Sequence, residues 1–121
     1  MSVVFRQLAE VMIFVDDLPA TRTWFVAFLG IEPDLDEPEG VGFRIGPHEL
    51  HLRPADVKSP ARTAGSVAYW EVPSVDAAIE RATALGATVH RGPGDVPEAG
   101  IRICQLREPG GVVFGMLERL A

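Results

Sequence analysis

The sequence reads as two consecutive copies of one unit, and this duplication restricts the fold more than any other feature. The run Phe28-Leu29-Gly30-Ile31 matches Ala84-Leu85-Gly86-Ala87 at a distance of 56 residues. Each run ends a segment in which apolar residues recur at helical spacing, and each such segment follows a short run of strand-forming residues. A repeat of this length is typical of a duplicated supersecondary unit. The chain of 121 residues has room for one domain that contains both copies.

Within each copy, the expected order is one strand, one helix and three further strands. Asp17 is expected to cap a first helix that ends at Gly30, and Ser74 or Asp76 to cap a second helix that ends at Gly86. Glycine and proline separate the extended segments. These segments are 8–15, 31–36, 41–45, 49–53, 67–72, 87–91, 101–106 and 112–117. We therefore predict one α+β domain, 1–121, with βαβββ modules at about 6–53 and about 67–118 and a linker at about 54–66.

Composition excludes several classes of protein. The net charge of −6 argues against a nucleic-acid-binding protein that relies on phosphate neutralisation. The single cysteine, Cys104, allows no internal disulfide and no cysteine-rich zinc site, and its apolar surroundings favour a buried thiol over a nucleophile. No apolar run has the length of a membrane span, and the first residues lack the pattern of a signal peptide. We expect a cytoplasmic protein with no nucleic-acid or membrane partner.

The first strand is apolar on both sides, which requires a cover on both sides. Positions 11, 13 and 15 are apolar, and so are Met12 and Phe14 between them. The helix of the same module covers one side, and a second sheet or a cupped cavity must cover the other. Glu10 lies on the side of Met12 and Phe14, where a carboxylate is costly unless it is paired. Glu10 is therefore either a functional residue of a cavity or a strand-end residue that reaches solvent.

Several short motifs follow one another in a fixed order. They are Val15-Asp16-Asp17-Leu18, Trp24-Phe25-Val26-Ala27-Phe28-Leu29-Gly30, Val75-Asp76-Ala77-Ala78, Ala84-Leu85-Gly86-Ala87 and Glu108-Pro109-Gly110-Gly111. Together they resemble the vicinal oxygen chelate superfamily, which contains glyoxalases, bleomycin-resistance proteins and extradiol dioxygenases. The resemblance covers about residues 6–118. It implies two βαβββ modules whose sheets curve around a cavity, often in a homodimer that shares its sites.

The resemblance also implies where a divalent metal ion would bind. In metal-dependent members, four side chains hold the ion, one each from the first and last strands of both modules. Carried over position by position, the first module supplies Glu10 and His51, with Glu49 as an alternative on the same face as His51. An open site of this kind would act as a Lewis acid.

The second module lacks the corresponding ligands. The same comparison gives Val67, or Ser66 after a shift of one residue, and Gly115. Val67 offers no donor atom and Gly115 has no side chain. We therefore expect no complete metal site and no cofactor; if an ion were bound, Glu10, His51 and Glu49 would hold it.

The expected function is binding of a small molecule by a glyoxalase/bleomycin-resistance-type homodimer with an incomplete metal site. A flat or aromatic ligand would lie in the cupped cavity. Met12, Phe14 and Tyr69 would form its apolar walls, since flat apolar side chains favour flat ligands. Arg53 shares the face of His51 and would hold an anionic group.

Two other classes of function remain open. The first is an enzyme: either a metal-dependent lyase, isomerase or dioxygenase with Ni, Zn, Mn or Fe, or a metal-free epimerase or cyclase. In the metal-free case Glu10 and His51 would be the catalytic acid and base. The second is a module that serves only as a dimerisation partner.

Overall fold

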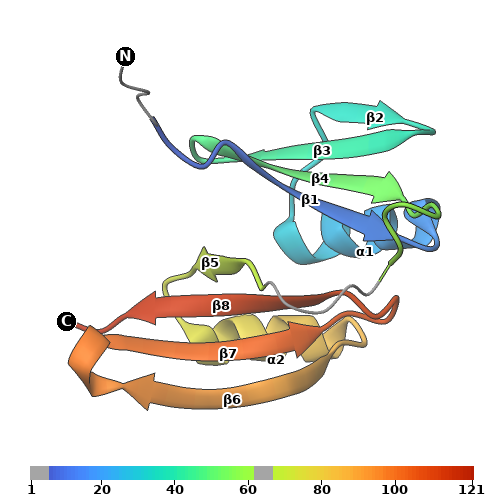
Figure 1. The fold of residues 1–121 in the computed structure, drawn as a ribbon. Coiled ribbons are helices and arrows are strands. Elements are labelled where there is room, and N and C mark those ends of the chain that lie inside the picture. Colours follow the sequence, from blue (N-terminus) through green and yellow to red (C-terminus); the bar gives the residue numbers. More distant parts are fainter. Residues whose placement is uncertain (1–5, 62–66) are drawn as a thin grey trace.

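The computed structural model describes residues 6–61 and 67–121 (Figure 1). The first copy of the unit consists of β1 (Glu10–Val15), α1 (Leu18–Leu29), β2 (Leu35–Glu37), β3 (Gly40–Ile45) and β4 (His48–Pro54). The second consists of β5 (Tyr69–Glu71), α2 (Val75–Ala84), β6 (Thr88–Val96), the 3-10 helix η1 (Pro97–Ala99), β7 (Ile101–Arg107) and β8 (Val113–Arg119). The prediction of an α+β fold with two βαβββ modules is confirmed.

Each copy forms a four-stranded mixed sheet. The strand order is β1-β4-β3-β2 in the first, here called sheet 1, and β5-β8-β7-β6 in the second, here called sheet 2. In both, the first strand of the copy pairs in parallel with its last strand, and the remaining pairs are antiparallel. The helix of each copy packs on one face of its own sheet. We call the other face of each sheet its open face.

The two helices begin at the residues that local sequence indicates. The Asp17 side chain accepts a hydrogen bond from the backbone N–H of Ala20 at 3.0 Å, which satisfies one donor of the first turn of α1. Gly30 ends α1 in the left-handed conformation, with φ of 72°. Ser74 caps α2 through a hydrogen bond from Ala77 at 3.1 Å. These caps are local signals, and for this reason sequence alone located both helices.

Strand β6 differs from its prediction. The Gly92-Pro93-Gly94 segment was expected to end a strand at 91, but β6 continues through it to Val96. The pairing register with β7 shifts at two places around Arg91, so the additional residues are accommodated as irregularities in the ladder. β6 is an edge strand, and Pro93, which has no N–H, lies in the irregular stretch between Arg91 and Gly94 where it has no pairing partner. β2 is also shorter than the predicted 31–36, because it begins only at Leu35.

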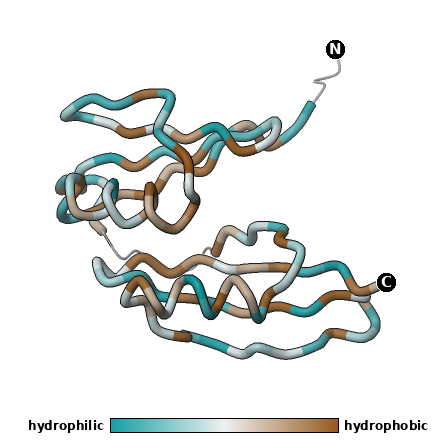
Figure 2. The backbone as a smooth tube through the Cα atoms, turned by 180° about the vertical axis from the view of Figure 1, so that it is seen from behind, coloured by the Kyte–Doolittle hydropathy of each residue, from teal (hydrophilic) through white to brown (hydrophobic). Residues whose placement is uncertain are grey.

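The helix-covered faces of both sheets share one core. Trp24 of α1 stacks on Phe28 with ring centroids 4.9 Å apart, and its ring lies 5.9 Å from that of Phe114 of β8. The Trp24 indole N–H donates to the carbonyl of Leu85, just past the end of α2, at 2.8 Å. Figure 1 shows α1 between its own sheet and the second module, and Figure 2 shows the hydrophobic start of β8 beside it. The open faces therefore lie outside the common core.

The side of β1 that faces away from α1 is only partly covered. The sequence predicted a cover on both sides, and α1 covers the side of Val15, which is 2% exposed. On the open face, Met12 remains 39% exposed and Phe14 is half-buried. Tyr69 on the open face of sheet 2 is similarly 41% exposed. Within the described part of one chain, these apolar side chains thus have only a partial cover.

Candidate functional site

The open face of sheet 1 brings together the residues that the sequence singled out. Pairing of β1 with β4 places every second residue of both strands on this face. They are Glu10, Met12 and Phe14 from β1 and Glu49, His51 and Arg53 from β4. The expected side of Glu10 and the expected common face of Glu49, His51 and Arg53 both agree with this register.

Glu10, Glu49 and His51 form a compact polar cluster. One potential ligand atom of each lies within 4.8 Å of the others. His51 Nε2 lies 3.2 Å from Glu49 Oε2 and 3.8 Å from Glu10 Oε2. The Arg44 guanidinium donates a hydrogen bond to Glu49 Oε1 at 2.6 Å and offsets part of the negative charge. The His51 side chain is 19% exposed, so this cluster is shielded yet accessible from the open face.

A glycine makes room for the imidazole of this cluster. Gly42 of β3 is the pairing partner of His51. A Cβ atom at position 42 would lie 2.8 Å from His51 Nε2, so any side chain there would displace the imidazole. Sequence reasoning missed this role, although a glycine inside a strand is a signal for the close approach of another group.

The corresponding place in sheet 2 is filled by an aromatic ring. Tyr69 of β5 pairs with Gly115 of β8, the position at which the resemblance placed a fourth metal ligand. A Cβ atom on Gly115 would overlap the Tyr69 ring, so the ring lies directly on the backbone of β8. The Tyr69 hydroxyl accepts a hydrogen bond from the Gln105 amide at 2.8 Å. Val67 is half-buried and carries no donor, and Ser66 lies outside the described residues.

The donors present therefore fit a four-ligand metal centre only in part. Sheet 1 offers two carboxylates and one imidazole. In the second module, the carried-over positions Val67, just before β5, and Gly115 of β8 offer no side-chain ligand. Three donors on a single sheet leave several coordination positions of a divalent ion to groups from elsewhere.

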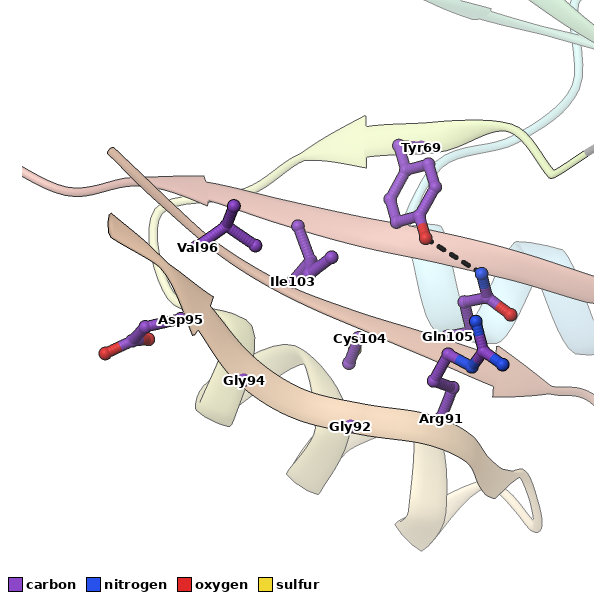
Figure 3. A pocket seen from close by; sticks show the side chains of 9 residues that line it. All are labelled: Tyr69, Arg91, Gly92, Gly94, Asp95, Val96, Ile103, Cys104 and Gln105. Atoms are coloured by element: carbon purple, nitrogen blue, oxygen red, sulfur yellow. Dashed lines mark hydrogen bonds between the residues drawn. The ribbon is translucent and has the colours of Figure 1, made fainter. Parts of the chain in front are cut away.

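A pocket lies beside Tyr69 on sheet 2 (Figure 3). Its volume is about 180 Å³. Side chains of β5, β6 and β7 line it, among them Tyr69, Arg91, Ile103 and Gln105. Sequence reasoning missed Arg91 and Gln105 as site residues. The facing of β6 depends on its register irregularities, and a strand predicted to end at Arg91 does not include them.

The arginines of the two sheets differ in their partners. Arg53 lies on the open face of sheet 1 and is exposed, with no ion pair among the residues that the structure describes. Arg102 lies on the helix side of sheet 2 and contacts Asp76 and Asp95, each at 3.0 Å. Hydrogen bonds to Asp76 and then to Asp95 raise the pKa of the Arg102 guanidinium above its ordinary value. Arg102 thus holds α2 and β6 to β7, while Arg53 is available to a ligand.

Cys104 of β7 is buried, as the sequence predicted. The residue is 2% exposed, and burial raises the pKa of its thiol. Because the thiolate is the reactive form, a raised pKa lowers the reactive fraction at neutral pH.

We expect iodoacetamide to alkylate Cys104 of the folded protein at least about tenfold more slowly than Cys104 of the urea-unfolded protein. Because the chain has one cysteine, intact-mass spectrometry measures the rate of this alkylation directly. Equal rates in the folded and unfolded protein would show that the thiol is accessible.

Comparison with known proteins agrees with this geometry. The family model described as Glyoxalase/Bleomycin resistance protein/Dioxygenase superfamily matches residues 7–116. No curated protein shows a sequence match to the chain. Among the described residues, neither helix is long and apolar enough to cross a membrane.

Several solved structures share the fold. The antibiotic binding protein TnmS3 from Streptomyces sp. CB03234 is 18% identical with a TM-score of 0.79, covering 98% of this chain and 99% of that one. A glyoxalase/bleomycin resistance protein/dioxygenase family enzyme from Burkholderia phytofirmans PsJN is 19% identical with a TM-score of 0.78, covering 93% and 98%. A glyoxalase-related enzyme from Fulvimarina pelagi is 20% identical with a TM-score of 0.76, covering 95% and 89%. At such identities the likeness shows the fold alone. With the family model spanning nearly the whole sequence, the chain belongs to the glyoxalase/bleomycin resistance protein/dioxygenase superfamily.

Proposed function

We propose that this protein binds a flat or aromatic small molecule on the open faces of its sheets, without a complete metal site. The observation that carries the proposal is the contact of Tyr69 with Gly115. An aromatic ring occupies the space of a would-be metal ligand and offers its exposed face for stacking. A small-molecule ligand is also what the name of one structural neighbour states, since TnmS3 is called an antibiotic binding protein.

The proposal includes a homodimer in which each site draws on both chains. Because the helix-covered faces share one core, the open faces turn outward and leave Met12 and Tyr69 partly exposed. A two-fold arrangement would place sheet 2 of one copy over sheet 1 of the other and cover both. We expect a dimer in sedimentation experiments.

A thermal-shift screen with planar antibiotics and aromatic acids tests the binding function. A ligand at one hundred times its dissociation constant should add about 2.7 kcal/mol to the free energy of unfolding. Tyr69→Ala should abolish the shift, whereas Tyr69→Phe, which keeps the ring, should retain most of the shift produced by uncharged planar ligands. Ligands that stabilise the Tyr69→Ala variant as well as the wild type would place binding elsewhere. Failure of the whole panel would contradict the flat-ligand proposal.

A second candidate function rests on the cluster of Glu10, Glu49 and His51. With ligand atoms within 4.8 Å of one another, these residues would hold Ni, Zn, Mn or Fe if the protein were a metal-dependent lyase, isomerase or dioxygenase. Without metal, Glu10 and His51 would be the base and acid of an epimerase or cyclase. The proposed binding function is favoured because the second module supplies no matching donors at Val67 and Gly115.

Calorimetric titration of dialysed protein with each of the four metal ions separates the two candidates. The binding function predicts affinity no tighter than micromolar, since the three donors come from one sheet. Stoichiometric sub-micromolar binding, lost in Glu10→Gln and His51→Ala but kept in Glu32→Gln, would replace the proposal with a metalloenzyme. Glu32 is the matched control because it is an exposed acid outside the cluster.

A further inference from the structure

We propose that the pocket beside Tyr69 binds the carboxylate end of a planar aromatic ligand and that Arg91 selects the anion. This inference rests on the proposed function, because the pocket belongs to the open face of sheet 2. It adds the chemical class of the ligand and a specificity-determining residue that the sequence did not indicate.

Arg91 is placed to receive an anion. It pairs with Gln105 across β6 and β7, and Figure 3 shows its side chain beside the Gln105 amide at the pocket. Within the described ranges, no ion pair or hydrogen bond engages the Arg91 guanidinium. The neighbouring arginines of sheet 2 do have partners: Arg102 binds two aspartates, and Arg107 contacts His90 at 3.2 Å. A guanidinium with five unused donors matches a carboxylate in the bidentate mode.

A second donor points to the same ligand group. The Tyr69 hydroxyl oxygen already accepts a hydrogen bond from the Gln105 amide at 2.8 Å. The hydroxyl hydrogen is therefore free for donation to a ligand oxygen. One face of the Tyr69 ring lies against Gly115, which leaves the opposite face for an aromatic ring of the ligand. Arg91 and the Tyr69 hydroxyl thus supply donors for a carboxylate beside a stacking surface.

The volume of the pocket and the charges around it fit one end of a ligand and not a whole ligand. The pocket volume of about 180 Å³ is below the roughly 300–1,000 Å³ typical of complete ligand sites. Asp95 lines the pocket, but its carboxylate pairs with Arg102 at 3.0 Å and points away from the pocket in Figure 3. The acid therefore does not oppose an anion near Arg91.

The single tyrosine of the chain gives a specific probe of this pocket. Biosynthetic 3-fluorotyrosine produces one ¹⁹F resonance, that of Tyr69. We expect 2-naphthoate to shift this resonance and the neutral isostere 2-naphthamide to bind about tenfold more weakly. Arg91→Gln should weaken naphthoate binding by about the same factor and leave naphthamide binding unchanged. Arg119→Gln is the matched control: it removes an equal charge from sheet 2, outside the pocket lining.

A second variant tests the pocket without touching Arg91. Gly94 shares the open face with Ile103, and a Cβ atom there would contact nothing within 4 Å. Gly94→Val should therefore fold normally, fill the pocket and weaken binding of both probes. Equal affinity of the two probes, unaltered in Arg91→Gln, would overturn this inference and leave the proposed function standing. Absence of any ¹⁹F shift with either probe would overturn both.

Discussion

Replacing Phe114 by alanine should lower the free energy of unfolding by about 4 kcal/mol, the largest effect expected for a single substitution in this protein. Phe114 is 1% exposed at the start of β8. Its ring centroid lies 5.9, 5.6 and 5.7 Å from those of Trp24, Phe25 and Phe28 of α1. The substitution removes a ring of sheet 2 that packs against α1, so the variant loses transfer free energy and gains a cavity between the modules.

The control for this prediction is the residue that precedes Phe114 in the chain. Val113 is half-buried on the open face of the same strand, so Val113→Ala should cost less than about 1 kcal/mol. Urea unfolding followed by tryptophan fluorescence and by circular dichroism measures both variants. If the modules share one core, the wild type unfolds in a single transition by both probes. A wild-type unfolding curve with two steps, or a loss below about 1 kcal/mol for Phe114→Ala, would contradict the shared core.

The parts of the fold that sequence predicted are those fixed by neighbouring residues. Asp17 and Gly30 bound α1 because a cap is a contact within one turn of chain. The common face of Glu49 and His51 followed from strand alternation alone. Placing Glu10 beside them required more than alternation. The resemblance implied it through ligand positions on the first and last strands of the module, and the parallel pairing of β1 with β4 explains it.

The parts that sequence did not predict depend on pairing between distant segments. The position of Tyr69 over Gly115 requires the register of β5 on β8. The facing of Arg91 requires the irregular register of β6 on β7, which no local pattern of Gly and Pro encodes. The Trp24 contact with Leu85 joins the two modules, and alternation within one module carries no information about it. The pocket on sheet 2 could therefore be found only from the structure.

Replacing Glu108 by alanine should lower the free energy of unfolding by about 3 kcal/mol, although the residue lies in a turn. Glu108 is 2% exposed between β7 and β8, and its carboxylate accepts hydrogen bonds from the backbone N–H groups of Gly110 at 2.8 Å and Val112 at 2.9 Å. Hydrogen bonds to a charged group contribute about 1.5–3 kcal/mol each, and Val112 would be left with a buried, unsatisfied donor. Urea unfolding gives the loss, with the exposed Glu98→Ala as control.

The effect of Glu108→Ala should extend from the turn to the candidate site. The turn joins β7 and β8, whose pairing places Gln105 opposite Gly115. The Tyr69 ring packs on Gly115. A loosened turn lets this end of the hairpin open, and Leu106 amide exchange should then accelerate before exchange of the α1 amides does. Glu108→Gln keeps one carbonyl acceptor and should lose about half as much free energy. A Glu108→Ala variant as stable as Glu98→Ala would mean that the backbone hydrogen bonds of the turn are enough to fix the pairing of β7 with β8 beside the pocket.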